Sequence, residues 1–150
     1  MRIALFTERV PAISPGVATT IEAIIGHMPG DLDVIPYRVD TRSLSALCTS
    51  QMLERARRDR IDMIHLSACG LPAIVALSVA WRLNVPVVGS FAGDFAFTPL
   101  RAWYLRALSN RCQRIFAPSA AASERLAAAG VDSGKIVTLT CLPYFGPAEA

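Results

Sequence analysis

The sequence is poor in the residues from which zinc sites, disulfide scaffolds and nucleic-acid-binding surfaces are built. It has two histidines and four cysteines in 150 residues, and no two cysteines have the Cys-x-x-Cys spacing. We therefore expect no metal site and reduced thiols, as is usual for a cytoplasmic protein. The net charge is only +3 and the arginines are scattered, so we expect no nucleic-acid partner.

Long hydrophobic runs and the signature motifs of several enzyme classes are also missing. The most apolar segment, residues 71–88, is interrupted by Arg82, Asn84 and Pro86, so we expect no membrane-spanning helix. The apolar run at the N-terminus is too short for a signal sequence and is expected to form a strand. The chain has no Gly-x-Ser-x-Gly and no Gly-x-Gly-x-x-Gly motif, which disfavours a nucleophilic hydrolase and an NAD-binding domain.

The residues that are present favour an α/β domain. Apolar residues make up 53% of the chain and charged residues 18%, and short apolar runs alternate with segments at helical spacing. We predict one domain over residues 1–150, a doubly wound, Rossmann-like parallel sheet of six strands with helices on both faces. The strands are predicted at residues 2–7, 32–37, 62–67, 85–91, 114–119 and 135–140, and the helices at 16–28, 50–60, 70–84, 99–111 and 120–130.

For two of the predicted helices the sequence also indicates how deeply the helix is buried or where it begins and ends. The 70–84 helix is apolar nearly all round and should be deeply buried. Ser119 is expected to cap the 120–130 helix, and Gly130 is expected to end it.

Ligands of doubly wound folds bind beyond the carboxyl ends of the strands, where the strand order reverses. In the common order 3-2-1-4-5-6 the first and fourth strands are neighbours, so the loops after Thr7 and Phe91 should face each other across a crevice. Gly16, at the start of the first helix, either offers unpaired amides to a phosphate or only begins a helix. Asp94 in the second loop either orients a sugar hydroxyl or takes a proton, or it is a loop carboxylate held by nearby amides.

Other polar residues allow two interpretations each. His65 inside the third strand is more typical of a satisfied core group than of a catalyst. Ser67 at the end of that strand either binds a ligand or starts the turn. The arginines between residues 55 and 60 are expected to form a solvated face, with weak contact to acidic lipid headgroups as the alternative.

Three stretches of the chain carry a resemblance to a known family. They are MRIALFTERVP followed by PGVATTIEAI, then DMIHLSACGLPAIVALSVAWRLNVPVVGSF followed by DF, and finally RIFAPSAAASERLAAAGVDSGKI. Together they resemble the N-terminal, acceptor-side domain of the family-4 glycosyltransferases of the GT-B superfamily, over residues 1–142. The pattern is similar to that of members acting on mannosyl or glucosyl lipid and glycan acceptors.

The resemblance implies that this half binds the acceptor and places a glycine loop against the donor diphosphate, without a cofactor. By position, Gly16 and Val17 match the diphosphate loop. Phe91, Asp94 and Phe95 match the acceptor side, and Asp94 is the one candidate catalytic residue.

Further matches of the same resemblance fall on strands and on a helix start. His65 matches a strand histidine of the family, and Ser67 stands where a second histidine is common. Ser119 matches the serine that opens the last helix of this half. These three residues are therefore also expected to contact substrate.

The sequence departs from the family pattern at one loop and at its end. The loop histidine of the family falls on Ala92, and the chain ends where the donor-binding second domain would begin. The implied function is the acceptor-side half of a retaining glycosyltransferase, inactive alone. Its expected partners are a donor-binding domain, in trans or in a longer chain, or a second copy of itself, together with a sugar or lipid-linked acceptor. The alternatives are a non-catalytic binding module and a nucleotide-binding Rossmann domain.

Overall fold

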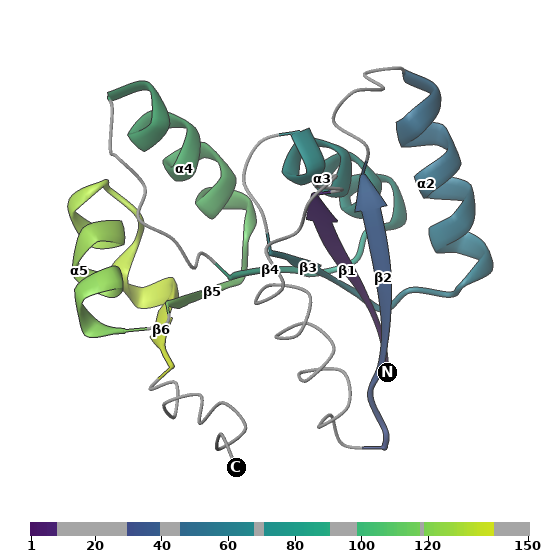
Figure 1. The fold of residues 1–150 in the computed structure, drawn as a ribbon, viewed down its shortest axis with the longest axis horizontal. Coiled ribbons are helices and arrows are strands. Elements are labelled where there is room, and N and C mark those ends of the chain that lie inside the picture. Colours follow the sequence, from purple (N-terminus) through teal and green to yellow (C-terminus); the bar gives the residue numbers. More distant parts are fainter. Residues whose placement is uncertain (9–29, 40–45, 68–70, 91–98, 118, 140–150) are drawn as a thin grey trace, which may run out of the picture.

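The computed structural model describes residues 1–8, 30–39, 46–67, 71–90, 99–117 and 119–139 (Figure 1). The strands are β1 (Arg2–Glu8), β2 (Asp33–Val39), β3 (Met63–Leu66), β4 (Val87–Ser90), β5 (Arg114–Ala117) and β6 (Ile136–Thr138). The helices are α2 (Ala46–Arg58), α3 (Leu71–Leu83), α4 (Pro99–Arg111) and α5 (Ala120–Ala128), and a short 3-10 turn, η1, covers Ser133–Lys135. The helix predicted at 16–28 lies outside the described residues.

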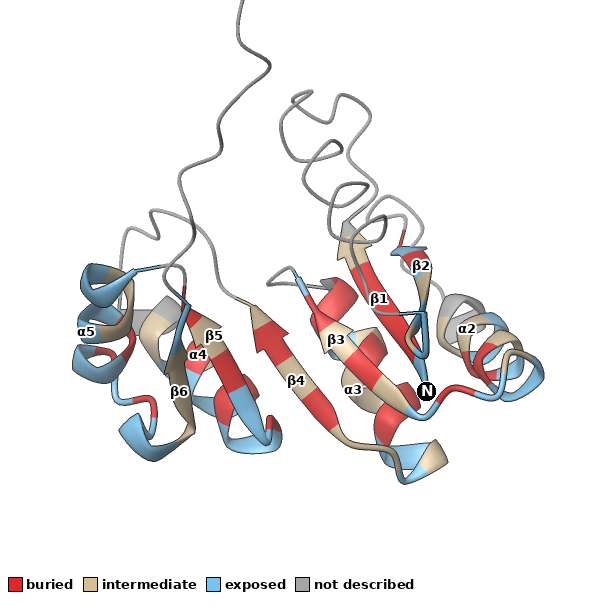
Figure 2. Ribbon diagram, turned by 90° about the horizontal axis from the view of Figure 1, so that it is seen from below, coloured by how far each residue is buried: buried red, intermediate tan, exposed pale blue. Residues whose placement is uncertain are grey.

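The strands form one six-stranded sheet in which every neighbouring pair is parallel, which confirms the predicted Rossmann-like α/β fold. Helices α2, α3 and α4 lie on the same face of the sheet, and α5 flanks its β5–β6 end (Figure 1). Seen from the other face, the strands point their carboxyl ends toward one edge (Figure 2). A ligand site of the usual α/β kind belongs at that edge.

The order of the strands differs from the prediction. It is β2-β1-β3-β4-β5-β6, so β3 lies between β1 and β4. The expected crevice between neighbouring first and fourth strands, with the loops after Thr7 and Phe91 facing each other, is therefore wrong. The reason is that the connection through α2 passes β1 and places β3 directly beside it, with Ala4 opposite Ile64. The strand order consequently reverses between β1 and β3.

The main core lies between the sheet and the helices of its covered face. Phe6 and Leu66 are fully buried there, and α2 adds Leu53 and Ala56, which are 8% and 0% exposed. The ring of Tyr37 on β2 stacks on Phe6 with 5.0 Å between the ring centroids. Through Phe6 and Leu66, β1 and β3, the two strands on either side of the reversal point, belong to one closely packed core.

The apolar helix α3 is buried on one side only. Ala73, Ala76 and Val79 are fully buried, whereas Ile74 is 49% exposed and Trp81 is 76% exposed. The prediction that this helix is deeply buried is therefore wrong for the side that carries Ile74 and Trp81. The elements that contact α3 most, α2, β3 and β1, cover only part of its circumference.

Three helices are followed by a residue with a left-handed backbone, and only one of these residues is a glycine. The φ angles are +87° at Gly130 after α5, 52° at Arg60 after α2 and 54° at Asn84 after α3. After α5 the N–H of Val131 donates to the carbonyl of Leu126 at 3.1 Å, which closes a Schellman cap. Gly130 therefore ends α5 as the sequence predicts.

Replacing Gly130 with alanine is expected to lower the free energy of unfolding by about 1 kcal/mol, because a left-handed backbone is strained for an L-residue. The added methyl group would also meet the Arg106 guanidinium, whose Nε lies 2.7 Å from that position. The matched control is Gly30→Ala, whose methyl group would meet nothing within 4 Å. Urea unfolding of both variants gives the comparison, and equal losses at the two positions would contradict this account of the cap.

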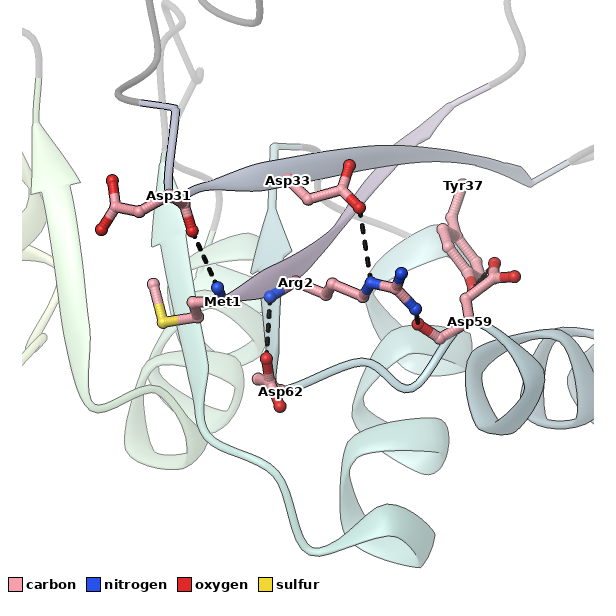
Figure 3. Close-up of polar contacts among 7 residues, drawn as sticks. All are labelled: Met1, Arg2, Asp31, Asp33, Tyr37, Asp59 and Asp62. Atoms are coloured by element: carbon pink, nitrogen blue, oxygen red, sulfur yellow. Dashed lines mark hydrogen bonds and ion pairs between the residues drawn. The ribbon is translucent and has the colours of Figure 1, made fainter.

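A polar network holds the opposite, amino-terminal edge of the sheet together (Figure 3). The backbone N–H of Arg2 donates to the Asp62 carboxylate at 2.8 Å. The guanidinium of Arg2 donates to the Asp59 carbonyl at 2.9 Å and lies 3.4 Å from the Asp33 carboxylate. These contacts tie β1 to β2 and to the connection between α2 and β3, so the acidic groups of this edge serve the fold.

The same network reaches a buried tyrosine. The hydroxyl of Tyr37 donates to the Asp59 carboxylate at 2.6 Å. The guanidinium of Arg55 lies 3.4 Å from that carboxylate and 4.3 Å from the centre of the Tyr37 ring. Burial, and then the hydrogen bond to Asp59, raise the pKa of the Tyr37 hydroxyl well above its ordinary value, so it stays a neutral donor. Arg55 is therefore engaged in the fold rather than forming part of a free basic face.

Candidate functional site

The candidate site lies at the carboxyl-terminal edge of the sheet, where the order reverses between β1 and β3. Ser67 directly follows β3 at this edge. Its backbone N–H and its hydroxyl both donate to the carbonyl of Phe6, at 3.1 and 3.0 Å. Ser67 thus links the ends of β1 and β3. Because Ser67 is exposed and its oxygen keeps acceptor lone pairs, it remains able to accept a hydrogen bond from a ligand.

A histidine and a serine form a pair across β3 and β4 close to the same edge. The register sets His65 opposite Val88, so Ser90 lies two residues nearer the edge. The Nε2 of His65 and the Oγ of Ser90 are 2.6 Å apart, and the Phe116 ring meets the imidazole edge-on with 6.3 Å between centroids. His65, Ser90 and Phe116 occupy the half-buried positions that alternate with buried ones along their strands. They therefore lie on the sheet face turned away from α2, α3 and α4.

The imidazole of His65 is neutral at pH 7, because burial lowers its pKa below the ordinary value. A neutral ring has one N–H donor and one acceptor nitrogen, so its tautomer decides whether Nε2 accepts the Ser90 proton or donates to its oxygen. The ring is hydrogen-bonded within the fold, as expected for a satisfied core group. The match to the strand histidine of the family stays a prediction.

The domain is expected to lose stability as the pH falls below about 6.5. In that window the unfolded chain binds a proton at residue 65, whereas the folded chain, in which the pKa of His65 is lowered, resists it. Acid therefore shifts the equilibrium toward unfolding, and stability is fully present above that pH. The His65→Asn variant should show a flatter dependence in urea unfolding series between about pH 7 and about pH 5. An unchanged slope in the variant would show that His65 does not carry the effect.

Ser119 lies at the same edge of the sheet, after β5. Its Oγ accepts a hydrogen bond from the N–H of Ala122 at 3.2 Å, and its carbonyl accepts one from the N–H of Ser123 at 3.0 Å. Ser119 is therefore the N-cap of α5, as predicted. Its assignment to substrate binding remains a prediction.

The structure places His65 on β3, Ser67 directly after β3 and Ser119 beyond β5. The other candidate residues lie outside the described part of the chain: Gly16, Val17, Phe91, Asp94 and Phe95. Sequence reasoning missed Ser90 and Phe116 as neighbours of the histidine. The alternation of side chains between the two faces of a strand could have identified them, since both residues occupy half-buried positions, on β4 and on β5.

The described ranges contain neither a metal-ligand cluster nor a membrane-spanning helix. There, no three histidine, cysteine, aspartate or glutamate side chains gather closely enough to hold a metal ion. Among the helices of the same ranges, none is both long and apolar enough to cross a membrane. Cys112 is an unpaired, buried thiol whose pKa is raised by burial to about 11, so it is a packing residue rather than a nucleophile.

The six-stranded parallel sheet and its covering helices define the class of this domain, a Rossmann-like α/β fold (Figure 1). The chain belongs to glycosyltransferase family 4, whose family model matches residues 41–141. A search of the curated proteins gives no match.

Solved structures share the fold at low sequence identity. HepE of Anabaena, crystallised with UDP-glucose, superposes with a TM-score of 0.72 and 14% identity over 93% of this chain. MnaA of S. aureus, in a co-structure with UDP, gives 0.66 and 14% over 91%. A glycosyltransferase of Rickettsia africae gives 0.64 and 16% over 91%. The present chain spans 43%, 43% and 42% of these three proteins, which is less than half of each.

Proposed function

We propose that this chain is the acceptor-side half of a retaining glycosyltransferase, which transfers a sugar from a nucleotide-sugar to a glycan or lipid acceptor. A second domain, in trans or in a longer chain, binds the donor. The reaction breaks the bond between the anomeric carbon and the nucleotide diphosphate and joins that carbon to an acceptor oxygen, which loses its proton. Because positioning and electrostatic stabilisation supply most of the rate, one half alone is expected to be inactive.

The polar edge of a family-4 domain is the observation that carries this proposal. Ser67 is exposed at the reversal point, and the half-buried His65–Ser90 pair lies beside it. Hydroxyls and a neutral imidazole both donate and accept, as sugar hydroxyls do, and the Phe116 ring adds an apolar surface for a sugar C–H face. No cofactor besides the nucleotide-sugar is needed. The scarcity of closely spaced cysteines supports a cytoplasmic location.

The direct test joins the chain to a donor-binding domain. The remaining part of Anabaena HepE is a suitable donor half, because HepE was crystallised with UDP-glucose and this chain overlays 43% of it. We expect UDP release from UDP-glucose when glucosyl or mannosyl glycan and lipid acceptors are added to the joined protein, and none from either half alone. A joined protein that folds and binds UDP but transfers no sugar to any of these acceptors would contradict the proposal.

In the joined protein, Ser67→Ala is expected to lower kcat/KM for the acceptor about 5- to 10-fold, the usual effect of one lost hydrogen bond. The stability should change little, because the Phe6 carbonyl keeps the hydrogen bond from the backbone N–H of residue 67. The matched control is Ser133→Ala in η1, an exposed serine before β6 and hence at the opposite edge of the sheet. An equal loss of kcat/KM in both variants would show that Ser67 does not contact the acceptor.

A non-catalytic binding module is the second candidate, favoured by Ala92 at the position of the family's loop histidine. The Ala92→His variant of the joined protein discriminates between the two. Turnover that appears only in this variant would assign the native chain to binding. Turnover already present with alanine would support the enzyme. Melting curves with NAD and with UDP-glucose test the remaining alternative, since stabilisation by NAD alone would indicate a nucleotide-binding Rossmann domain.

A further inference from the structure

An apolar groove, called here the α3 groove, runs along α3 toward the amino-terminal edge of the sheet. It has a volume of about 470 Å³ and is lined by Ile74, Leu77 and Trp81 of α3, by Val87 at the start of β4 and by Arg111 at the end of α4. Both helices lie on the same face of the sheet (Figure 1). Since Val87 opens β4 and Arg111 precedes β5, the groove lies away from the candidate acceptor site at the carboxyl-terminal edge.

The wall that α3 gives to this groove is one stripe of side chains. Ile74, Leu77, Ser78 and Trp81 are spaced three and four residues apart, so they lie on one side of the helix. Ile74 and Trp81 are 49% and 76% exposed, so two large apolar side chains of this stripe face solvent. From Ile74 to Trp81 the stripe is about 10 Å long, or two helical turns. A surface of this form packs against the apolar side of a second helix.

One end of the stripe carries positive charge. Arg82 follows Trp81 on α3, Arg111 borders the groove, and both arginines are exposed. Within the described ranges neither guanidinium forms an ion pair, and neither α3 nor α4 contains an aspartate or glutamate. Both arginines stand at the end of their helix, next to the amino-terminal edge. A helix complementary to the groove therefore has acidic side chains at one end and an apolar stripe behind them.

The described helices of the chain do not supply that complement to a second copy. The first turn of a helix is the favourable place for acidic side chains, because carboxylates there also compensate the helix dipole. None of the four described helices, α2, α3, α4 and α5, has an acidic residue in its first turn. The occupant that fits both the apolar stripe and the arginines is therefore a helix of another protein.

We propose that the α3 groove binds an acidic amphipathic helix of a partner protein. The apolar stripe of that helix lies on Ile74 and Trp81, and the carboxylates of its first turn contact Arg82 and Arg111. Because both arginines stand at the end of α3 and α4, the partner helix runs antiparallel to α3, and the two helix dipoles attract each other. The contact leaves the candidate acceptor site uncovered. It needs neither donor nor acceptor and does not depend on the proposed function.

The experiment uses the full chain and a fluorescein-labelled synthetic helix of about 15 residues. This glutamate peptide has leucines along one side and glutamates in its first turn, and a lysine peptide has lysines in place of the glutamates. Fluorescence anisotropy should show saturable binding of the glutamate peptide, at least about 10-fold tighter than that of the lysine peptide. In the Trp103→Phe variant Trp81 is the only indole, so a blue shift of its emission with unlabelled peptide reports contact in the groove.

Two variants test the two components of the contact. The Arg82→Glu/Arg111→Glu variant should reverse the preference and bind the lysine peptide more tightly than the glutamate peptide. Loss of folding cannot produce such a reversal. The Trp81→Ala variant should bind the glutamate peptide at least about 10-fold more weakly, while the melting temperature is kept because the side chain is 76% exposed.

The matched controls make the same changes at other exposed positions. Arg57→Glu/Arg58→Glu on α2 alters the net charge equally, and Trp103→Ala removes a tryptophan that is 63% exposed and does not line the groove. Both variants should bind the glutamate peptide nearly as well as the unchanged chain. Equal losses in the controls, equal affinity for the two peptides, or no binding up to about 1 mM peptide would each overturn the proposal. A blue shift of Trp81 that needs only a high protein concentration would overturn it in favour of a second copy in the groove.

Discussion

The Leu66→Ala variant will unfold with a free energy about 2–5 kcal/mol below that of the unchanged chain, the usual cost of this truncation in a core. Leu66 is fully buried at the end of β3, between Phe6 on one side and Gly89 on the other. Gly89 has no side chain that could move into the space left by the lost atoms, so the cavity should persist. For a small domain this loss is a large part of the total stability.

The matched control is the same substitution at Leu139, which is 46% exposed and should change the unfolding free energy by no more than about 0.5 kcal/mol. Urea unfolding followed by circular dichroism measures both. Similar losses at the two leucines would mean that β3 is not the centre of the core.

The second large effect is expected at Asp59. Its replacement by alanine should lower the free energy of unfolding by about 2–3 kcal/mol, because the buried Tyr37 hydroxyl loses the acceptor that lies 2.6 Å away. Tyr37→Phe removes the donor instead and leaves the carboxylate paired with Arg55, so a loss of about 1 kcal/mol is expected.

The double variant Asp59→Ala/Tyr37→Phe lacks the hydrogen bond but leaves no unpaired hydroxyl in the core. Its loss should therefore be clearly smaller than the sum of the two single losses, and a double-mutant cycle measures the difference. Strict additivity would show that the two side chains are not coupled in solution.

Local features of the fold were predictable because they depend on neighbouring residues. The alternation of apolar runs and helical spacing predicted the six strands and the described helices, and Gly130 and Ser119 were identified as helix ends from their residue type alone. The strand order was not predictable in this way. A right-handed connection is satisfied whether β3 lies beyond β2 or beside β1, and the choice depends on packing between distant segments.

The difference between local features and contacts of distant segments also explains which residues of the site could be predicted. His65 and Ser67 could be named from the sequence because they lie in and after one strand. Their actual partners depend on register: Ser90 is 25 residues from His65, and the Phe6 carbonyl is 61 residues from Ser67. The exposed side of α3 was missed for a related reason, since an apolar helix looks buried until it is known which neighbours reach it.

The observed strand order changes the place at which the acceptor is expected to bind. A site between neighbouring first and fourth strands is excluded by the position of β3. The reversal point between β1 and β3 takes its place, with Ser67 at the junction and the His65–Ser90 pair beside it. The function proposed for this member of glycosyltransferase family 4 therefore depends on whether sugars bind at that junction.

Amide chemical shifts of the labelled chain, titrated with methyl glucoside and methyl mannoside, test this most directly. The account predicts that saturating sugar shifts the amides of Ser67 and Ser90 and leaves those of Asp62 and Gly134, at the amino-terminal edge, unchanged. Shifts confined to the amino-terminal edge, or no shift at any amide with either sugar, would contradict it.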